Sequence, residues 1–333
     1  MNYKELVLND PNYNFLKENE HLGKNIMLLT LGGSHSYGLN QENSDLDVRG
    51  ITLERQNELL GLDIFDQFEN KETDTTIYGF RKMIKLLSSC NPNCIEILAT
   101  NPEHILIMTK EGKLLRDNIE LFLSQKASRS FSGYARQQLR RLKNALARDS
   151  YTQPEKEEHI FNSINILHLQ EHYQPFTNEE VKLYIDKTDR EDFETEIFLD
   201  INLKHYPLRE FKSIHSEMSN VITEYGNLHH RNRKKDDVHL NKHISHLFRL
   251  YIMGAEILEG KGVYTYRNND RDFLLGLKTG KYVINDRYDF IEELLDPYIK
   301  RFEYAKIHTE LPKEPNYKNI NNLMIDIYRK VIA

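Results

Sequence analysis

Two acidic residues stand two positions apart in an otherwise apolar stretch near the start of the chain. Asp45 and Asp47 follow a Gly-Ser turn at Gly33 and Ser34, and that turn ends an apolar run. Side chains two positions apart on a strand share one face and are roughly 6.6–7 Å apart along the backbone, so two carboxylates there can converge on one cation. Ionised carboxylates beside an apolar core carry a desolvation penalty that a bound cation offsets. The pattern therefore predicts a divalent-metal site.

A third carboxylate on a neighbouring strand would complete such a site. The next acidic candidates are Glu69, Glu72 and Asp74. Asp74 opens a run of strand-forming residues that continues to Tyr78, so the strand register favours Asp74 as the third ligand. Glu72 remains the alternative.

The elements that must position these carboxylates are two strands and a helix. We expect a first strand over 25–33 and a second over 45–53, whose alternation places Arg49 on the same face as the two acids. Apolar residues at helical spacing then predict a helix over 79–89. Alternating strands and helices up to about residue 120 indicate an α/β or α+β domain.

From about residue 121 the strand-like runs end and long helical patterns follow. Between residues 121 and 148 every charged residue is basic. These residues are Lys126, Arg129, Arg136, Arg140, Arg141, Lys143 and Arg148. The run predicts either contact with phosphate groups, including those of RNA, or a solvated helix face.

A further helix is expected over 238–258, ended by Gly260, with one apolar and one polar stripe. The polar stripe holds Lys242, His246 and Arg249 at positions i, i+4 and i+7. Lysine and arginine supply positive charge, and histidine can donate or accept a hydrogen bond. The trio can therefore hold a phosphate or a base.

Two groups of His and Cys residues could in principle bind zinc, but their spacing does not favour a zinc site. His239, His243 and His246 share one side of the same helix, but three ligands from one helix rarely converge on one ion. Cys90 and Cys94 have no second Cys/His pair nearby. They are therefore more typical of small core residues than of zinc ligands.

Length, charge and the distribution of apolar residues restrict the class of protein further. A length of 333 residues suggests two domains, and 45 basic against 51 acidic residues give a net charge of −6, which disfavours a protein that coats nucleic acid. The polar segment 1–20 lacks a secretory apolar region, and no run approaches the roughly 18–20 apolar residues of a transmembrane helix. We therefore expect a cytoplasmic protein without membrane contact.

The motifs resemble those of a known family. They are Gly33-Ser34, Tyr37-Gly38 and Ser44-Asp45-Leu46-Asp47-Val48-Arg49-Gly50. They are similar to the Gly-Ser…Asp-x-Asp signature of the DNA polymerase β-like nucleotidyltransferase superfamily, in particular its bacterial and phage branch of predicted nucleotidyltransferases. Further similar positions extend over most of the chain, at Asp74, Tyr78, Lys82, 91–98, 133–139, Lys242, His246, Arg249 and 271–274.

This resemblance implies an α+β fold. A polymerase β-like palm, a mixed sheet with flanking helices, would occupy 1–124 as the catalytic domain. A mostly α-helical C-terminal domain over 125–333 would bind the substrate.

The resemblance also implies a mechanism. Asp45, Asp47 and Asp74 would be the catalytic residues and bind two Mg²⁺ or Mn²⁺ ions, and Asp74 would also orient or deprotonate the acceptor hydroxyl. The Gly33 backbone and the Ser34 hydroxyl would hold the triphosphate of an NTP, and basic residues of the helical domain would close over the phosphates or the acceptor. The full set of expected nucleotide contacts is Gly33, Ser34, Tyr37, Arg49, Arg136, Lys242, His246 and Arg249.

The expected reaction is transfer of an NMP from the NTP to a hydroxyl-bearing acceptor with release of pyrophosphate. The acceptor stays open between a small molecule, a protein side chain and an RNA end. Two other functions compete with this one: a catalytically silent nucleotide-binding regulatory module, and a metal-dependent phosphodiesterase or nuclease that uses the same acids. The intact pair of Asp45 and Asp47 disfavours the silent module.

Overall fold

The chain forms two compact units. The computed structural model describes residues 3–42, 44–150, 181–187, 195–209, 211–212, 215, 218–219, 222, 237–282 and 287–332. One unit comprises residues 1–139 and 241–333, and the other comprises 140–240. The second unit includes an antiparallel hairpin of β6 (Val181–Lys187) and β7 (Thr195–Ile201), so the expectation that strands end at about residue 121 was wrong. The domain boundary expected between residues 124 and 125 stays a prediction.

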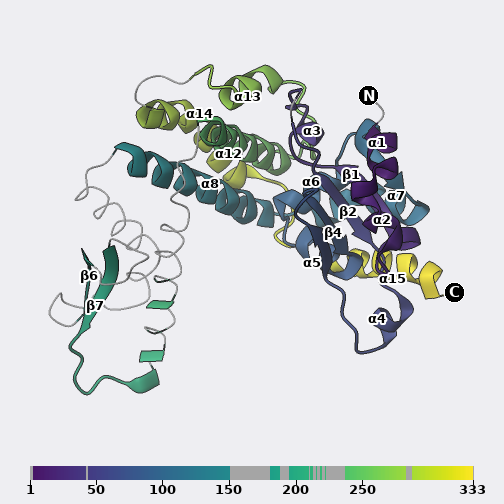
Figure 1. Ribbon diagram of the computed structural model, residues 1–333, viewed down its shortest axis with the longest axis horizontal. Coiled ribbons are helices and arrows are strands. Elements are labelled where there is room, and N and C mark those ends of the chain that lie inside the picture. The colour runs from purple at the N-terminus through teal and green to yellow at the C-terminus, as the bar shows by residue number, and fades with distance from the viewer. Residues whose placement is uncertain are drawn as a thin grey trace. The chain divides into compact units, whose positions relative to one another are not determined.

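The first unit contains a mixed five-stranded sheet of order β3-β4-β2-β1-β5. Its strands β1, β2 and β4 are labelled in Figure 1. Its strands are β1 (Ile26–Leu31), β2 (Val48–Thr52), β3 (Gln67–Asn70), β4 (Thr75–Gly79) and β5 (Ile105–Met108). β1 pairs antiparallel with β2 and β5, β3 pairs antiparallel with β4, and β2 and β4 run parallel. Parallel neighbours need a crossover connection, which here runs through α4 (Gln56–Leu60) and β3.

Helices flank the sheet and continue beyond it. The other helices are α1 (Tyr3–Asn9), α2 (Phe15–Glu18), α3 (Gly33–Tyr37), α5 (Phe80–Leu87), α6 (Pro92–Leu98), α7 (Lys110–Asp117), α8 (Lys126–Ser150), α12 (Asp237–Leu258), α13 (Arg271–Lys278), α14 (Arg287–His308) and α15 (Tyr317–Ile332). Short 3-10 turns occupy Pro11–Tyr13, Gly23–Asn25, Pro102–His104 and Ile119–Phe122. The α+β class is confirmed, and so are the helices expected over 79–89 and 238–258, which are α5 and α12.

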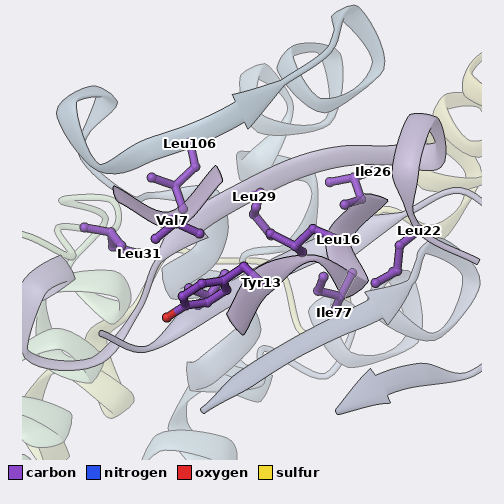
Figure 2. Close-up of a cluster of buried hydrophobic side chains, with 10 residues drawn as sticks. Val7, Tyr13, Leu16, Leu22, Ile26, Leu29, Leu31, Ile77 and Leu106 are labelled. Carbon is purple, nitrogen blue, oxygen red and sulfur yellow. The ribbon is translucent and has the colours of Figure 1, made fainter. Parts of the chain in front are cut away.

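The sheet core lies between β1 and the first helices. Every residue of β1 is buried, and Figure 2 shows apolar side chains of the N-terminal segment among those of the strands. The cluster consists of Val7, Tyr13, Leu16, Leu22, Ile26, Leu29, Leu31, Val48, Ile77 and Leu106. α7 packs so tightly that a Cβ on Gly112 would lie 2.1 Å from the Met27 carbonyl oxygen. β1 is thus a rigid base for the turn that follows it.

α12 is fixed by contacts with α8 and α14. His243 Nδ1 lies 2.9 Å from Gln138 Oε1 on α8. The Tyr251 and Phe302 rings pack edge to face at 5.5 Å. Gly254 brings the α12 backbone close to Phe302 and to Phe131, where a Cβ would lie 2.6 and 2.9 Å from their atoms. Among the helices that the structure describes, none combines the length and the apolar character needed to cross a lipid bilayer.

The second strand begins later than expected. β2 starts at Val48, whereas the segment from Asp45 to Asp47 has no regular structure. The reason is that β1 ends at Leu31, which pairs with Val48, and the chain then turns into α3. One further hydrogen bond, from the Gly32 amide to the Asp47 carbonyl oxygen (2.8 Å), extends the ladder. Asp45 therefore precedes the strand and is exposed.

Candidate active site

The parallel register of β2 and β4 places Asp47 beside Asp74. Val48 pairs with Thr75, and the Val48 amide donates a hydrogen bond to the Asp74 carbonyl oxygen at 3.2 Å. Asp74 ends the turn between β3 and β4 and has a left-handed backbone (φ 41°). The structure thus brings Asp74 against Asp47, as the register argument expected.

Arg49 links the two carboxylates. Its Nη2 atom lies 2.9 Å from Asp74 Oδ1 and 3.5 Å from Asp47 Oδ1. Its Nη1 atom donates to the carbonyl oxygens of Val48 and Asp74. The Arg49 guanidinium therefore binds Asp47 and Asp74 in this structure. This role differs from the expected contact with a nucleotide. That contact stays a prediction.

The two carboxylates differ in protonation behaviour. Burial, the hydrogen bond with Asp74, and repulsion from Asp74 and Asp45 raise the pKa of Asp47 to about 7, against the opposing effect of Arg49. The hydrogen bond with Asp47 lowers the pKa of Asp74, as does Arg49, although partial burial opposes this. Two carboxylates that share a site in this way gain from a cation that neutralises both.

The glycine turn after β1 lets this acidic pair approach the backbone. Gly33 has a φ of +53°, and a Cβ there would lie 1.6 Å from Asp47 Oδ2. At Gly32 a Cβ would lie 2.8 Å from Arg49 Cγ. Any side chain at Gly33 would occupy the space of the Asp47 carboxylate. The glycine of the Gly-Ser motif is therefore required for the position of the Asp47 carboxylate.

The acidic pair fits a divalent cation that a substrate helps to bind. In the described part of the chain, no group of three or more His, Cys, Asp or Glu side chains is close enough to hold a metal ion. Magnesium is commonly held by one or two carboxylates together with substrate phosphates. Asp47 and Asp74 supply such a pair of hard oxygen donors, and the missing Cβ of Gly33 lets the Asp47 carboxylate lie against the turn. The three-carboxylate set of the sequence analysis is not preassembled, because Asp45 lies in an irregular, exposed segment.

A cavity of about 1040 Å³ surrounds this site and lies within the first unit. It gathers all the expected site residues except Arg136. Those it gathers are Gly33, Ser34, Tyr37, Asp45, Asp47, Arg49, Asp74, Lys242, His246 and Arg249, with Glu72 also in its wall. Arg136 is exposed on α8, where its Nε donates to the Ser132 carbonyl oxygen at 3.3 Å. The structure thus unites residues of the sheet with residues of α12.

Arg249 and Tyr37 are engaged inside the protein. The Arg249 guanidinium forms an ion pair with Glu96 of α6 and stacks over the Tyr37 ring, with Cζ 3.7 Å from the ring centroid. The Tyr37 hydroxyl donates to Glu96 Oε2 at 2.6 Å. Arg249 Nη2 also lies 3.4 Å from His246 Nε2. Both side chains border the cavity, but these contacts support its wall, and their expected nucleotide contacts stay predictions.

Two residues of the cavity wall escaped the sequence analysis. Glu96 interrupts the apolar run Ile95-Glu96-Ile97-Leu98, and a charge inside such a run signals a buried partner. Lys278 follows Leu274 by four positions on the buried side of α13, and it is 9% exposed. Both signals are visible in the sequence, but neither identifies the partner.

The fold and the site together define a class. A mixed sheet that presents a carboxylate pair beside a Gly-Ser turn, followed by helices that complete the cavity, is the arrangement expected of a polymerase β-like nucleotidyltransferase. The chain belongs to the RNA repair pathway DNA polymerase beta family, because the model of that family (RlaP) matches residues 12–326. The resemblance stated from the motifs is thereby confirmed, and membership supports nucleotidyl transfer as the general activity. Comparisons with curated proteins and with solved structures gave no match.

Proposed function

We propose that this protein transfers an NMP from an NTP to a hydroxyl group at an RNA end and releases pyrophosphate. The single observation that carries the transfer step is the pairing of Asp47 with Asp74 beside Gly33, inside a cavity that also holds cationic side chains. Phosphoryl-type transfer depends mostly on positioning and on neutralising charge, so no further nucleophile is required of the chain.

Each element of the cavity has a distinct role in this proposal. The backbone at Gly33 and the Ser34 hydroxyl hold the triphosphate. Asp45, Asp47 and Asp74 hold Mg²⁺ or Mn²⁺, and Asp74 orients the acceptor hydroxyl. The acceptor hydroxyl loses its proton to Asp74 and its oxygen forms a bond to the α-phosphorus, while the bond from that phosphorus to the pyrophosphate oxygen breaks and pyrophosphate leaves with the electron pair. Bound metal would favour ionisation of the acceptor hydroxyl and would neutralise charge on the pyrophosphate.

RNA as the acceptor has two supports. The family is described as an RNA repair pathway family. The described N-terminal part of α8 also exposes Arg129, Arg136 and Arg141, and residues 121–148 contain no acidic side chain. A basic stripe of this kind can follow a phosphate backbone.

The test is transfer of label from an α-³²P-labelled NTP to an RNA oligonucleotide with a free 3′ hydroxyl, in the presence of Mg²⁺. The variant Asp45→Asn/Asp47→Asn should lose the labelled product, and EDTA should have the same effect on the unmodified protein. Asp66→Asn is the matched control, because the Asp66 side chain is 71% exposed and its ion pair with Lys82 is long at 4.0 Å.

The outcomes separate the competing functions. Label transfer that survives the double substitution would contradict the proposed catalytic role of the acids. Bound NTP without transfer to any acceptor would favour the silent module. Shortening of an unlabelled oligonucleotide without NTP would favour the phosphodiesterase or nuclease.

A further inference from the structure

One face of β4 extends the acidic site along the cavity. Thr76 pairs in register with Arg49, whose guanidinium binds the Asp74 carboxylate, so these groups lie on one face of the sheet. Tyr78 is two positions further on and shares that face, roughly 6.6–7 Å from Thr76 along the backbone. Thr76 and Tyr78 are half-buried and border the cavity, whereas the residues that alternate with them are buried.

This face of β4 and the Gly33 turn lie on opposite sides of Asp47. In the sheet, β2 lies between β1 and β4. Gly33 therefore approaches Asp47 from the side of β1, whereas Asp74 approaches it from the side of β4. In the proposed function the triphosphate occupies the Gly33 turn, which leaves the space over Thr76 and Tyr78 for the acceptor.

Tyr78 presents a neutral ring and an available hydroxyl to this space. In the described part of the chain its hydroxyl has no hydrogen-bond partner, unlike that of Tyr37, which donates to Glu96. A tyrosine that serves only the core usually pairs its hydroxyl. Burial raises the pKa of Tyr78 to about 12, with further increases from Cys94 of α6 and Tyr134 of α8. The side chain thus stays protonated near neutral pH.

The β3 side of this face carries mixed charge. Glu69 pairs in register with Thr76. Lys71 and Glu72 border the cavity in the turn before Asp74. Lys71 attracts a phosphate backbone, but the two glutamates repel it, so this side offers no continuous basic path.

The α6 side leads to α8. Asn91, which directly precedes α6, donates its side-chain amide to the Tyr134 hydroxyl of α8 at 2.9 Å, and Asn93 of α6 borders the cavity. α8 is the helix whose exposed arginines support RNA as the acceptor. A strand that ends at Asp74 can therefore pass Tyr78 and reach the basic helix beside α6.

We propose that the 3′-terminal nucleoside of the RNA acceptor lies along β4, with its ribose over Thr76 and its base stacked on the Tyr78 ring. This inference rests on the proposed function and adds the residues that hold the end of the acceptor. A nucleoside with its 3′ hydroxyl at Asp74 can extend over Thr76 and bring its base to Tyr78. Because every base has a π face, the site accepts RNA ends whatever their last base.

The test uses the full chain with Mg²⁺ and an RNA oligonucleotide whose 3′-terminal base is 2-aminopurine, a base whose fluorescence falls when it stacks. Tyr78→Leu removes the ring, and Tyr78→Phe keeps it. Tyr78→Met is a second variant without the ring if Tyr78→Leu does not fold, as judged by circular dichroism and thermal melting. Tyr264→Leu is the matched control, because Tyr264 is 55% exposed and is not among the residues that border the cavity.

The unmodified protein, Tyr78→Phe and the control should quench the terminal 2-aminopurine, whereas the variants without the ring should not. In label transfer, loss of the ring should raise the KM for RNA by about five- to a hundredfold, as expected for one stacked base. The KM for the NTP should stay within about twofold. Equal quenching without the ring would overturn the inference. So would a larger rise in the KM for the NTP, because the base of the NTP would then occupy Tyr78.

The two proposals fail separately. Quenching that depends on Tyr78 in a protein that never transfers label would leave this site standing and contradict the proposed transfer to RNA. Normal label transfer to RNA with quenching that does not depend on Tyr78 would contradict only the position of the terminal base.

Discussion

Arg249 and Glu96 form an ion pair whose side chains are 1% and 6% exposed. The pair joins α12 to α6, and the Tyr37 hydroxyl extends it to α3 through the same carboxylate. The Glu96 backbone is also fixed, because Thr100 and Thr265 both donate to its carbonyl oxygen at 3.0 Å. One buried carboxylate thus connects three of the elements around the cavity.

Removing one member of this pair should therefore destabilise the protein strongly. Glu96→Met leaves the Arg249 guanidinium buried without a counter-ion and should lower the free energy of unfolding by about 3–5 kcal/mol. Urea denaturation measures the change. The double variant Glu96→Met/Arg249→Met should recover part of the loss, because no buried charge remains. A loss below about 1 kcal/mol for the single variant, as at the exposed pair of Lys113 and Asp117, would contradict the structural role.

Gly33 should tolerate no side chain. The added Cβ of Gly33→Ala would meet Asp47 Oδ2, and the backbone is left-handed there. We expect a loss of about 1–3 kcal/mol in unfolding free energy and loss of label transfer.

Gly133→Ala on α8 is the matched control for that substitution, because a Cβ there has nothing within 4 Å. An alanine in a helix should increase stability by about 0.5–1 kcal/mol. Equal effects of the two substitutions would contradict the close approach at Gly33.

The ion pair between Glu259, which directly follows α12, and Arg301 of α14 should weaken in acid. Hydrogen bonds from Arg301 at 2.7 Å, and from Lys261, lower the pKa of Glu259 from 4.5 to about 2. Because the folded-state pKa lies below the unfolded one, the stabilisation is complete above about pH 4.5 and is lost as the pH falls through about 2. Because solvent screens this partly exposed ion pair, its contribution is at most about 2 kcal/mol.

The check is the free energy of unfolding of the native protein and of Glu259→Gln, measured between pH 6 and pH 2. The difference between the two proteins should shrink as the pH falls. A constant difference over this range would show that the Glu259 carboxylate is not stabilised by its arginine partner.

Removing the positive charges of α8 should weaken the binding of RNA more than the binding of the nucleotide. Replacing Arg129, Arg136 and Arg141 with Gln should raise the KM for an RNA acceptor and reduce the salt dependence of RNA binding by about one unit of slope per lost phosphate contact. The KM for the NTP should stay within about twofold. Filter binding at several salt concentrations provides the measurement, with Lys110→Gln/Lys113→Gln on α7 as the control. An equal effect of the control would point to net charge instead of a defined RNA surface.

Sequence reasoning reached the sheet and the acidic residues near it because both depend on local patterns, although Asp45 precedes β2 and does not share a strand face with Asp47. The apolar run of β1, the glycine turn and the short spacing between Asp45 and Asp47 are properties of adjacent residues. The choice of Asp74 over Glu72 also followed from strand register, and the structure places Asp74 against Asp47. The roles of these residues in catalysis stay predictions.

Contacts between residues far apart in the sequence could not be predicted, because local patterns do not identify the partner. The late start of β2 depends on where its partner β1 ends, and the partners of Arg249 and Lys278 lie far away in the sequence. Lys242, His246 and Arg249 all border the cavity, and their expected contact with a phosphate or a base stays a prediction. Helical spacing does not reveal that Arg249 turns to Glu96, because that choice is made by tertiary packing.

The division of the first unit between residues 1–139 and 241–333 has a consequence for protein synthesis. A ribosome completes Asp47 and Asp74 long before it reaches Lys242 and Lys278. All five strands of the sheet, with Arg49 beside the two acids, precede α12 and α13 in the chain. The cavity is therefore completed only when α12 and α13 are made, so a truncated translation product would carry the acids and Arg49 without Lys242, His246 and Lys278.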